Sequence, residues 1–230
     1  MDSTATSGPP AAAAELSGFQ YVIRPGNHDV TLLLLHGTGG DEYDLLDLGA
    51  FLSPGSSLVG ARGRAPEGTV NRWFARFSPG VLDEDDIRRR AEELSGFVSA
   101  VTRQNRLNAL KVWAVGFSNG ANMAAAMLLL RPGLFAGAVL FRPMLPLLPE
   151  SVPDLAGIPV LIASGMRDTM IPRHSTEDLA ALLTRSGAQA EVRWADAGHR
   201  FGHDEVEQAR QWLERRLDLP GRKTGSKDGQ

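Results

Sequence analysis

The stretch KVWAVGFSNGANMAAAM, residues 111–127, decides the fold of this chain. Its first part is a short apolar run typical of a buried strand, and its second part is rich in Ala and Met, which favour helix. Between them stands Gly116-Phe117-Ser118-Asn119-Gly120, a G-x-S-x-G match. Such a turn projects the serine hydroxyl, and small neighbours let strand and helix approach closely. The context predicts Ser118 as a nucleophile; the alternative is a plain helix cap.

The segments on either side repeat this alternation of short β-rich runs and longer helical patterns. The expected strands are 19–24, 30–36, 57–61, 111–116, 136–141, 159–164 and 191–195, and the expected helices are 41–52, 83–105, 119–130, 175–186 and 204–217. We predict an α/β-hydrolase fold, a mostly parallel central sheet of about seven strands with helices on both faces, in three layers. The first run should form an antiparallel edge pair with the second, and Ser175 or Thr176 should cap its helix.

Length and composition indicate one soluble domain. The 230 residues divide into a disordered lead (1–17), a single α/β-hydrolase domain (18–219) and a disordered tail (220–230). The lead lacks the pattern of a signal peptide, and the longest apolar stretches, such as Met123 to Leu130, fall short of the roughly 20 residues of a membrane span. The expected location is therefore the cytoplasm. A net charge of −3 gives no basis for nucleic-acid binding.

Cysteine is absent from the sequence. Its absence excludes disulfides, a thiolate metal site and a cysteine nucleophile together. Nothing in the pattern requires a metal or an organic cofactor, so we expect none.

A serine nucleophile needs a base, and in this fold the order along the chain is Ser, Asp or Glu, His. The histidines after Ser118 are His174, His199 and His203. His199 lies in ADAGHRFG, a Gly-flanked loop between the last expected strand and helix, where an imidazole can reach the strand ends. We therefore predict His199 as the base, with His174 and His203 as surface or cap residues.

The acid is predicted to be Asp168. It ends LIASGMRD, an apolar strand followed by a turn, where a buried carboxylate can accept a hydrogen bond from histidine Nδ1 and fix the tautomer. The alternative is an aspartate at a helix entry. Asp154 precedes its strand and Asp196 lies too near His199 along the chain, so both are weaker candidates.

The tetrahedral intermediate also needs hydrogen-bond donors. His36-Gly37-Thr38-Gly39-Gly40 is a Gly-rich turn after an apolar run, and it can present backbone N–H groups. One N–H of this loop and that of Asn119 would form the oxyanion hole, while His36 holds the turn. A phosphate-binding loop is the competing interpretation, but neither G-x-G-x-x-G nor a Walker lysine is present.

Five segments together resemble the phospholipase/carboxylesterase branch of the α/β-hydrolases, small bacterial serine esterases related to acyl-protein thioesterases. They are LLLLHGTGGDE (Leu32–Glu42), RWF (Arg72–Phe74), VGFSNGANMA (Val115–Ala124), SGMRDTMIP (Ser164–Pro172) and AGHRF (Ala197–Phe201). The resemblance implies Ser118, Asp168 and His199 as the triad and the backbone of Thr38 and Asn119 as the oxyanion hole. Related thioesterases often carry Gln in place of Asn119, a change that leaves backbone donation intact.

The resemblance also implies that residues 60–77 lie beside the pocket, with Trp73 and Phe74 lining it. From the residues alone these aromatics fit a core equally well. Gly37 and Met170 complete the predicted substrate-binding set. The segment from Arg142 to Asp154 is expected to form a lid or a dimer contact, and related proteins often pair, so a homodimer is a further expectation.

The resulting hypothesis is hydrolysis of short- to medium-chain carboxylic esters through an acyl-enzyme. Alternatives are a thioesterase or lysophospholipase on the same machinery, or a non-catalytic ligand-binding protein of the same fold. Dienelactone hydrolases share the fold but usually employ a cysteine, which this chain lacks. Arg62, Arg64, Arg72 and Arg76 could favour an acidic leaving group, although a solvated loop explains them more simply.

Overall fold

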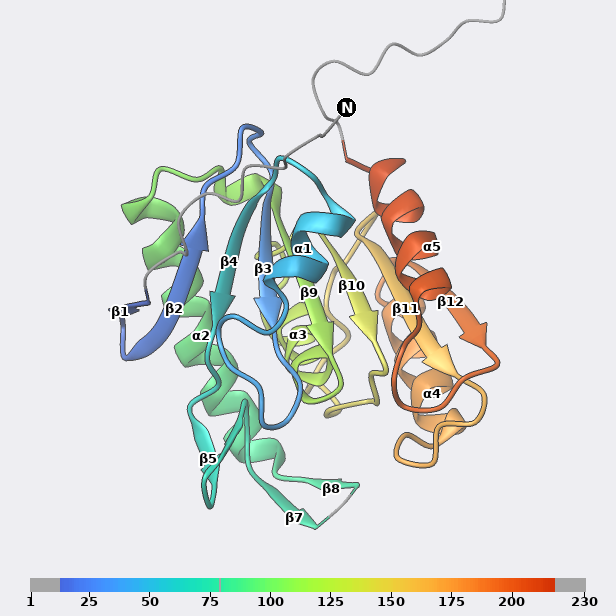
Figure 1. Ribbon diagram of the computed structural model, residues 1–230. Coiled ribbons are helices and arrows are strands. Elements are labelled where there is room, and N and C mark those ends of the chain that lie inside the picture. Colours follow the sequence, from blue (N-terminus) through green and yellow to red (C-terminus); the bar gives the residue numbers. More distant parts are fainter. Residues whose placement is uncertain (1–12, 79, 218–230) are drawn as a thin grey trace, which may run out of the picture.

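The computed structural model describes residues 13–78 and 80–217, which form three layers (Figure 1). A central sheet is covered by helices α1 and α5 on one face and by α2, α3 and α4 on the other. This confirms the predicted α/β-hydrolase architecture. The proposed tail (220–230) and most of the proposed lead lie outside the described residues, so the disorder expected there stays a prediction.

The predicted strands and helices occur in the predicted order, whereas several short strands and a 3₁₀ turn were not predicted. The elements are β1 (Ala14–Leu16), β2 (Phe19–Arg24), β3 (Thr31–Leu35), α1 (Leu46–Leu52), β4 (Ser57–Ala61), β5 (Ala65–Glu67), β6 (Val70–Arg72), β7 (Arg76–Ser78), β8 (Val81–Leu82), α2 (Glu84–Gln104), η1 (Ala109–Lys111), β9 (Val112–Phe117), α3 (Asn119–Leu130), β10 (Gly137–Phe141), β11 (Pro159–Gly165), α4 (Arg173–Arg185), β12 (Gln189–Ala195) and α5 (His203–Glu214).

The main sheet has eight strands in the order β1-β2-β4-β3-β9-β10-β11-β12. From β4 to β12 all neighbours are parallel, whereas β2 is antiparallel to β1 and β4. The predicted direction of the first run was right but its partner was wrong, because β4 lies between β2 and β3. The segment between β2 and β3 is instead hydrogen-bonded to the turn that precedes β4, since the N–H groups of Asn27 and His28 both donate to Gly55 O.

The run TLLLL of β3 explains how the sheet is buried on both faces. Leu33 and Leu35 belong to the core cluster under α2, α3 and α4, whereas Leu32 and Leu34 belong to the cluster under α1 and α5. Successive side chains of a strand point to opposite faces, so a strand covered on both sides is apolar throughout.

Several boundaries differ from the predicted ones by one or more residues, and three of these differences correct a prediction. The sheet begins at Ala14, inside the proposed lead. Helix α1 begins at Leu46 rather than residue 41, because the Asp41 side chain accepts the N–H of Tyr43 in a turn. Helix α4 begins at Arg173 after Pro172, with no side-chain cap. Ser175 and Thr176 are therefore not N-caps.

Two small hairpins, β5–β6 and β7–β8, extend beyond the carboxyl ends of the parallel strands (Figure 1). In open α/β sheets this is the edge where ligands bind. Across residues 13–78 and 80–217, no helix has the length and apolar character needed to cross a bilayer.

Candidate active site

Ser118 stands at the turn between β9 and α3, in a backbone conformation with φ 52° and ψ −115°. A positive φ is costly for a residue with a Cβ, so the surrounding structure must hold it. The two flanking glycines permit the turn. A Cβ on Gly116 would lie 2.6 Å from Gly120 O, and one on Gly120 would lie 2.0 Å from Leu35 O. The motif therefore reflects close packing of β9, α3 and β3.

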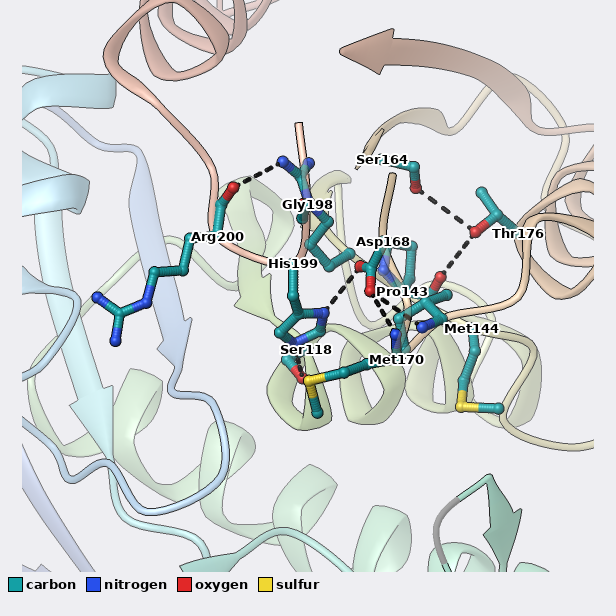
Figure 2. Close-up of polar contacts among 12 residues, drawn as sticks. Ser118, Pro143, Met144, Ser164, Asp168, Met170, Thr176, Gly198, His199 and Arg200 are labelled. Atoms are coloured by element: carbon teal, nitrogen blue, oxygen red, sulfur yellow. Dashed lines mark hydrogen bonds and ion pairs between the residues drawn. The ribbon is translucent and has the colours of Figure 1, made fainter. Parts of the chain in front are cut away.

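The structure brings Ser118, His199 and Asp168 together from three different loops (Figure 2). His199 Nε2 lies 2.9 Å from Ser118 Oγ, and His199 Nδ1 lies 2.8 Å from Asp168 Oδ2. The three residues follow β9, β12 and β11 respectively. They meet because the carboxyl ends of parallel strands share one edge of the sheet.

Backbone hydrogen bonds hold the Asp168 side chain in place. Its side chain is 2% exposed, and its Oδ1 accepts the backbone N–H groups of Met170 and Ile171 at 2.8 and 3.1 Å. Such donors orient a carboxylate. Its other oxygen is thereby left to accept His199 Nδ1–H, which leaves Nε2 free to accept the Ser118 hydroxyl.

The alternative acids and bases do not reach Ser118. Asp196 is 69% exposed and pairs with Arg167 at 3.1 Å, and Asp154 accepts the N–H of Ala156 in its own turn. His174 is exposed on α4, and His203 begins α5. Only His199 and Asp168, among the candidates weighed from the sequence, make hydrogen bonds in line with Ser118.

His36 holds the start of the Gly-rich loop. It is buried, its Nδ1 lies 2.6 Å from Gly37 O, and its Nε2 accepts the N–H of Gly63 at 2.9 Å. This pattern requires the neutral ring with its proton on Nδ1. Burial is the main cause that lowers the pKa of His36 below its usual 6.5.

We expect the folded protein to lose stability below about pH 6.5, because the unfolded chain then takes up a proton that folded His36 resists. The stability from this histidine is present above that pH and is lost as the pH falls toward the lowered folded pKa. Each 1 kcal/mol lost should lower Tm by about 2–4 °C. Thermal unfolding between pH 5.0 and 7.5 measures it. In His36→Gln, which retains an acceptor for Gly63 N–H but does not titrate, the pH dependence should be smaller; equal slopes would contradict the prediction.

Strand β6 and the residues after it support the loop from the other side. Gly39 N–H donates to Asn71 O, and Arg72 donates to Thr38 Oγ1 at 3.1 Å. Trp73 Nε1–H donates to His36 O at 2.9 Å. These bonds fix the loop next to Ser118.

Trp73 and Phe74 are core residues and not the pocket lining that was predicted. They are 2% and 0% exposed, and both belong to the core cluster with Leu35. Trp73 also donates its backbone N–H to Asn119 Oδ1 at 2.8 Å. Both N–H donors of Trp73 thus bond to residues beside Ser118 while its ring is buried in the core, so this segment supports the site without lining it.

A cavity of about 460 Å³ opens at Ser118, a size that suits a small organic ligand. Its lining comprises Thr38, Phe117, Ser118, Met170, His199, Arg200 and Phe201. Met170 was predicted to line the pocket and does so. Gly37 was also predicted there, but it is not part of the lining and packs against the Phe117 ring: a Cβ added to Gly37 would lie 2.8 Å from Phe117 Cδ1. Phe117 and Phe201 were missed, although they stand inside the GFSNG and AGHRF motifs.

A second space of about 370 Å³ shares Thr38, Ser118 and Met170 with the first and is also lined by Asn119 and Asn122.

The four arginines of the segment 60–77 each pair with a carboxylate: Arg62 with Glu42 at 2.6 Å, Arg64 with Glu93 at 3.6 Å, and Arg72 and Arg76 with Glu67 at 3.2 and 3.0 Å. Arg72 and Arg76 share the single carboxylate of Glu67, so these two arginines keep one net positive charge, and both line the second space. Within residues 13–78 and 80–217, no group of three or more His, Cys, Asp or Glu side chains is placed to hold a metal.

The chain is similar in sequence and in fold to known hydrolases and esterases. The family model described as the Dienelactone hydrolase family matches residues 81–215, a range that includes Ser118, Asp168 and His199. MhqD of Bacillus subtilis (strain 168), named as a hydrolase, is 43% identical over 193 residues, or 84% of this chain and 96% of that protein.

Solved structures agree. A carboxylesterase from Bacillus cereus superposes with a TM-score of 0.84 at 34% identity, over 86% of this chain and 95% of that one. A carboxylesterase from Mesorhizobium loti gives a TM-score of 0.82 at 34% identity, over 89% and 98%. The similarity extends over nearly the whole described domain and is not confined to the nucleophile turn.

Proposed function

The chain is a hydrolase that belongs to the dienelactone hydrolase family, and we propose that it cleaves short- to medium-chain carboxylic esters with Ser118, His199 and Asp168 as its triad. One observation carries the proposal. The continuous hydrogen-bonded line from Asp168 through His199 to Ser118 Oγ ends at a cavity partly lined by apolar side chains. Such a line is the arrangement that activates a serine hydroxyl.

Acylation follows from this geometry. As Ser118 Oγ bonds to the ester carbonyl carbon, its proton passes to His199 Nε2. The imidazolium gives that proton to the leaving alkoxide as the carbon–oxygen bond breaks, which leaves an acyl-enzyme. Water then repeats both steps and releases the acid. Asp168 stays ionised throughout, holds the ring through Nδ1 and stabilises its positive charge.

The oxyanion would be held by the backbone N–H groups of Thr38 and Asn119. Asn119 is the first residue of α3, where N–H groups have no acceptor within the helix. Thr38 lines the same cavity as Ser118, and the bonds of Gly39 and Arg72 keep its loop in place. A donor of this kind typically contributes about 10²–10³ in rate.

The apolar part of the cavity supports the substrate class. Phe117 and Phe201 pack edge to face with ring centroids 5.1 Å apart, and Met170 lies near Ser118 in Figure 2. These side chains suit a hydrocarbon group.

We expect a fluorophosphonate to label the purified protein covalently, with the adduct on Ser118, because the reagent requires an activated serine. Peptide mapping by mass spectrometry locates the adduct. Ser151→Ala, an exposed serine, is the matched control and should label like the wild type. Absence of labelling in the native protein would favour a ligand-binding protein of this fold.

The same protein should hydrolyse p-nitrophenyl esters from acetate upward, with the rate falling before laurate. A cavity of about 460 Å³ accommodates a short or medium chain better than a long one. A thioester and a lysophospholipid belong in the same panel. A much higher kcat/KM on either would assign the machinery to that substrate class.

A further inference from the structure

Arg142 is a fully buried cation whose side chain makes no hydrogen bond with the side chains of Ser118, His199 or Asp168. It directly follows β10, its side chain is 0% exposed, and its φ is 57°. Burying a charged group is costly unless every donor is matched. A buried arginine in a strained backbone position therefore needs an account of what its guanidinium binds.

Every N–H of the Arg142 guanidinium has an acceptor. Nε donates to Gly198 O at 2.9 Å, one terminal nitrogen donates to Ala163 O and Glu205 Oε1 at 3.1 and 2.6 Å, and the other donates to Arg200 O and Glu205 Oε2 at 3.1 and 3.0 Å. Arginine has five such donors in a rigid fork. The fork is fully used, and it joins β11, α5 and the loop between β12 and α5.

Two of these acceptors are the carbonyls on either side of His199, those of Gly198 and Arg200. The turn that carries Ser118 is held by the residue before Arg142, because the backbone N–H of Ser118 donates to Phe141 O at 2.8 Å. Residues 141 and 142 therefore bond to the backbone of the nucleophile and to the backbone on both sides of the base.

Glu205 orients the guanidinium. Its side chain, 11% exposed, takes both terminal nitrogens of Arg142 in a bidentate pair and also accepts the N–H of Gly202, which precedes α5. The same carboxylate thus fixes the arginine and the end of the loop that carries His199.

The backbone that carries Arg142 is itself anchored. Thr176 Oγ1 donates to Pro143 O (Figure 2). The N–H of Met144 donates to Asn122 Oδ1, and the N–H of Leu145 donates to Ser175 Oγ. The start of the segment expected to form a lid or a dimer contact is therefore tied to α3 and α4. This gives Arg142 a fixed base from which to hold the loop.

We propose that Arg142, oriented by Glu205, is a positioning residue that sets the distance between His199 Nε2 and Ser118 Oγ; the inference rests on the proposed function. Guanidinium contacts to the carbonyls of Gly198 and Arg200 leave the backbone of His199 little freedom. A displacement of about 1 Å in a catalytic group can cost about 10²-fold in rate.

The first test is Arg142→Lys, since an ammonium on a single stem cannot reach both loop carbonyls and both carboxylate oxygens. We expect kcat for p-nitrophenyl acetate and the rate constant of fluorophosphonate labelling to fall about 10- to 100-fold, with KM within about twofold. Arg173→Lys and Glu177→Gln alter an exposed pair of the same composition on α4 and should change neither rate. Unchanged rates in Arg142→Lys would overturn the proposal.

The second test separates positioning from stability. Replacing a buried ion pair by apolar side chains often leaves stability unchanged or improved. Arg142→Met with Glu205→Met leaves no buried charge unpaired, so its Tm should exceed that of Arg142→Met alone, while its labelling rate stays as low as in that single variant because the carbonyls of Gly198 and Arg200 have no donor in either. Recovery of the rate together with Tm would show a merely structural role. If the double variant does not fold, Arg142→Lys assayed well below its Tm decides the question.

Failure of this inference is distinguishable from failure of the proposed function. A wild-type protein that neither reacts with fluorophosphonate nor hydrolyses any ester would contradict the function. A wild-type protein that labels on Ser118, beside an Arg142→Lys variant that labels equally fast, would contradict the positioning role alone.

Discussion

Replacing Ser118 with alanine is expected to lower kcat for p-nitrophenyl acetate by about 10⁵- to 10⁶-fold, the loss typical when a triad serine is removed. Without Oγ there is no atom for the carbonyl carbon to bond to, and His199 Nε2 loses its hydrogen-bond partner. The remaining rate would come from water and the oxyanion donors. Steady-state assays at protein concentrations determined by absorbance measure the loss.

A second substitution at the same position controls for the fold. Ser118→Gly also removes Oγ, but glycine adopts φ 52° without strain. Relief of about 1–3 kcal/mol of strain, less about 0.5–1 kcal/mol of added chain entropy, should raise the free energy of unfolding by about 1 kcal/mol. Both variants should be inactive while differing in stability. Full activity in either one would end the assignment of Ser118.

Two of the three proposed triad residues, Ser118 and Asp168, could be predicted from local sequence because each follows an apolar strand. Ser118 follows VWAVGF and Asp168 follows VLIASG, and parallel strands bring such ends to one edge of the sheet. The structure places both beside His199, as the spacing predicts. The topology of the sheet alone is therefore enough to predict that Ser118 and Asp168 lie close together.

Contacts between distant segments could not be predicted in this way. The pairing of β2 with β4 depends on which strand fills the place beside β3, and the run lengths do not encode that choice. In the sequence, Trp73 is an aromatic residue in a segment expected beside the pocket. Only its hydrogen bonds to His36 O and Asn119 Oδ1 show that it supports the site from the core. Arg142 lacked any local motif, since all its partners lie more than 20 residues away.

The matched family and the chemistry of the chain are consistent with each other. The resemblance seen in the sequence was to serine esterases of the α/β-hydrolase fold, and the matching family model is that of the dienelactone hydrolases. Both are α/β-hydrolase-type esterases, so the family expectation is confirmed at that level. Because the sequence contains no cysteine, Ser118 is the residue available at the nucleophile turn.

Asp168→Asn should lower kcat by about 10⁴-fold while leaving the three side chains in place. The amide oxygen can still accept the N–H groups of Met170 and Ile171, so the amide nitrogen faces His199 Nδ1 and donates to it. The ring must then carry its proton on Nε2, where it cannot accept the proton of Ser118. The defect is a wrong tautomer, so KM should change little. Steady-state kinetics of the folded variant, checked by circular dichroism, measure the effect.

Asp196→Asn is the matched control, because it makes the same change in the loop that carries His199. Asp196 is exposed and pairs with Arg167 on the surface, and surface pairs contribute little, so kcat should stay within about twofold of the wild type. The opposite result, with Asp196→Asn inactive and Asp168→Asn active, would transfer the acid role to Asp196. Equal losses would mean that the loop, and not the carboxylate, determines the rate. A large loss confined to Asp168 is the outcome that a buried carboxylate hydrogen-bonded to His199 Nδ1 requires.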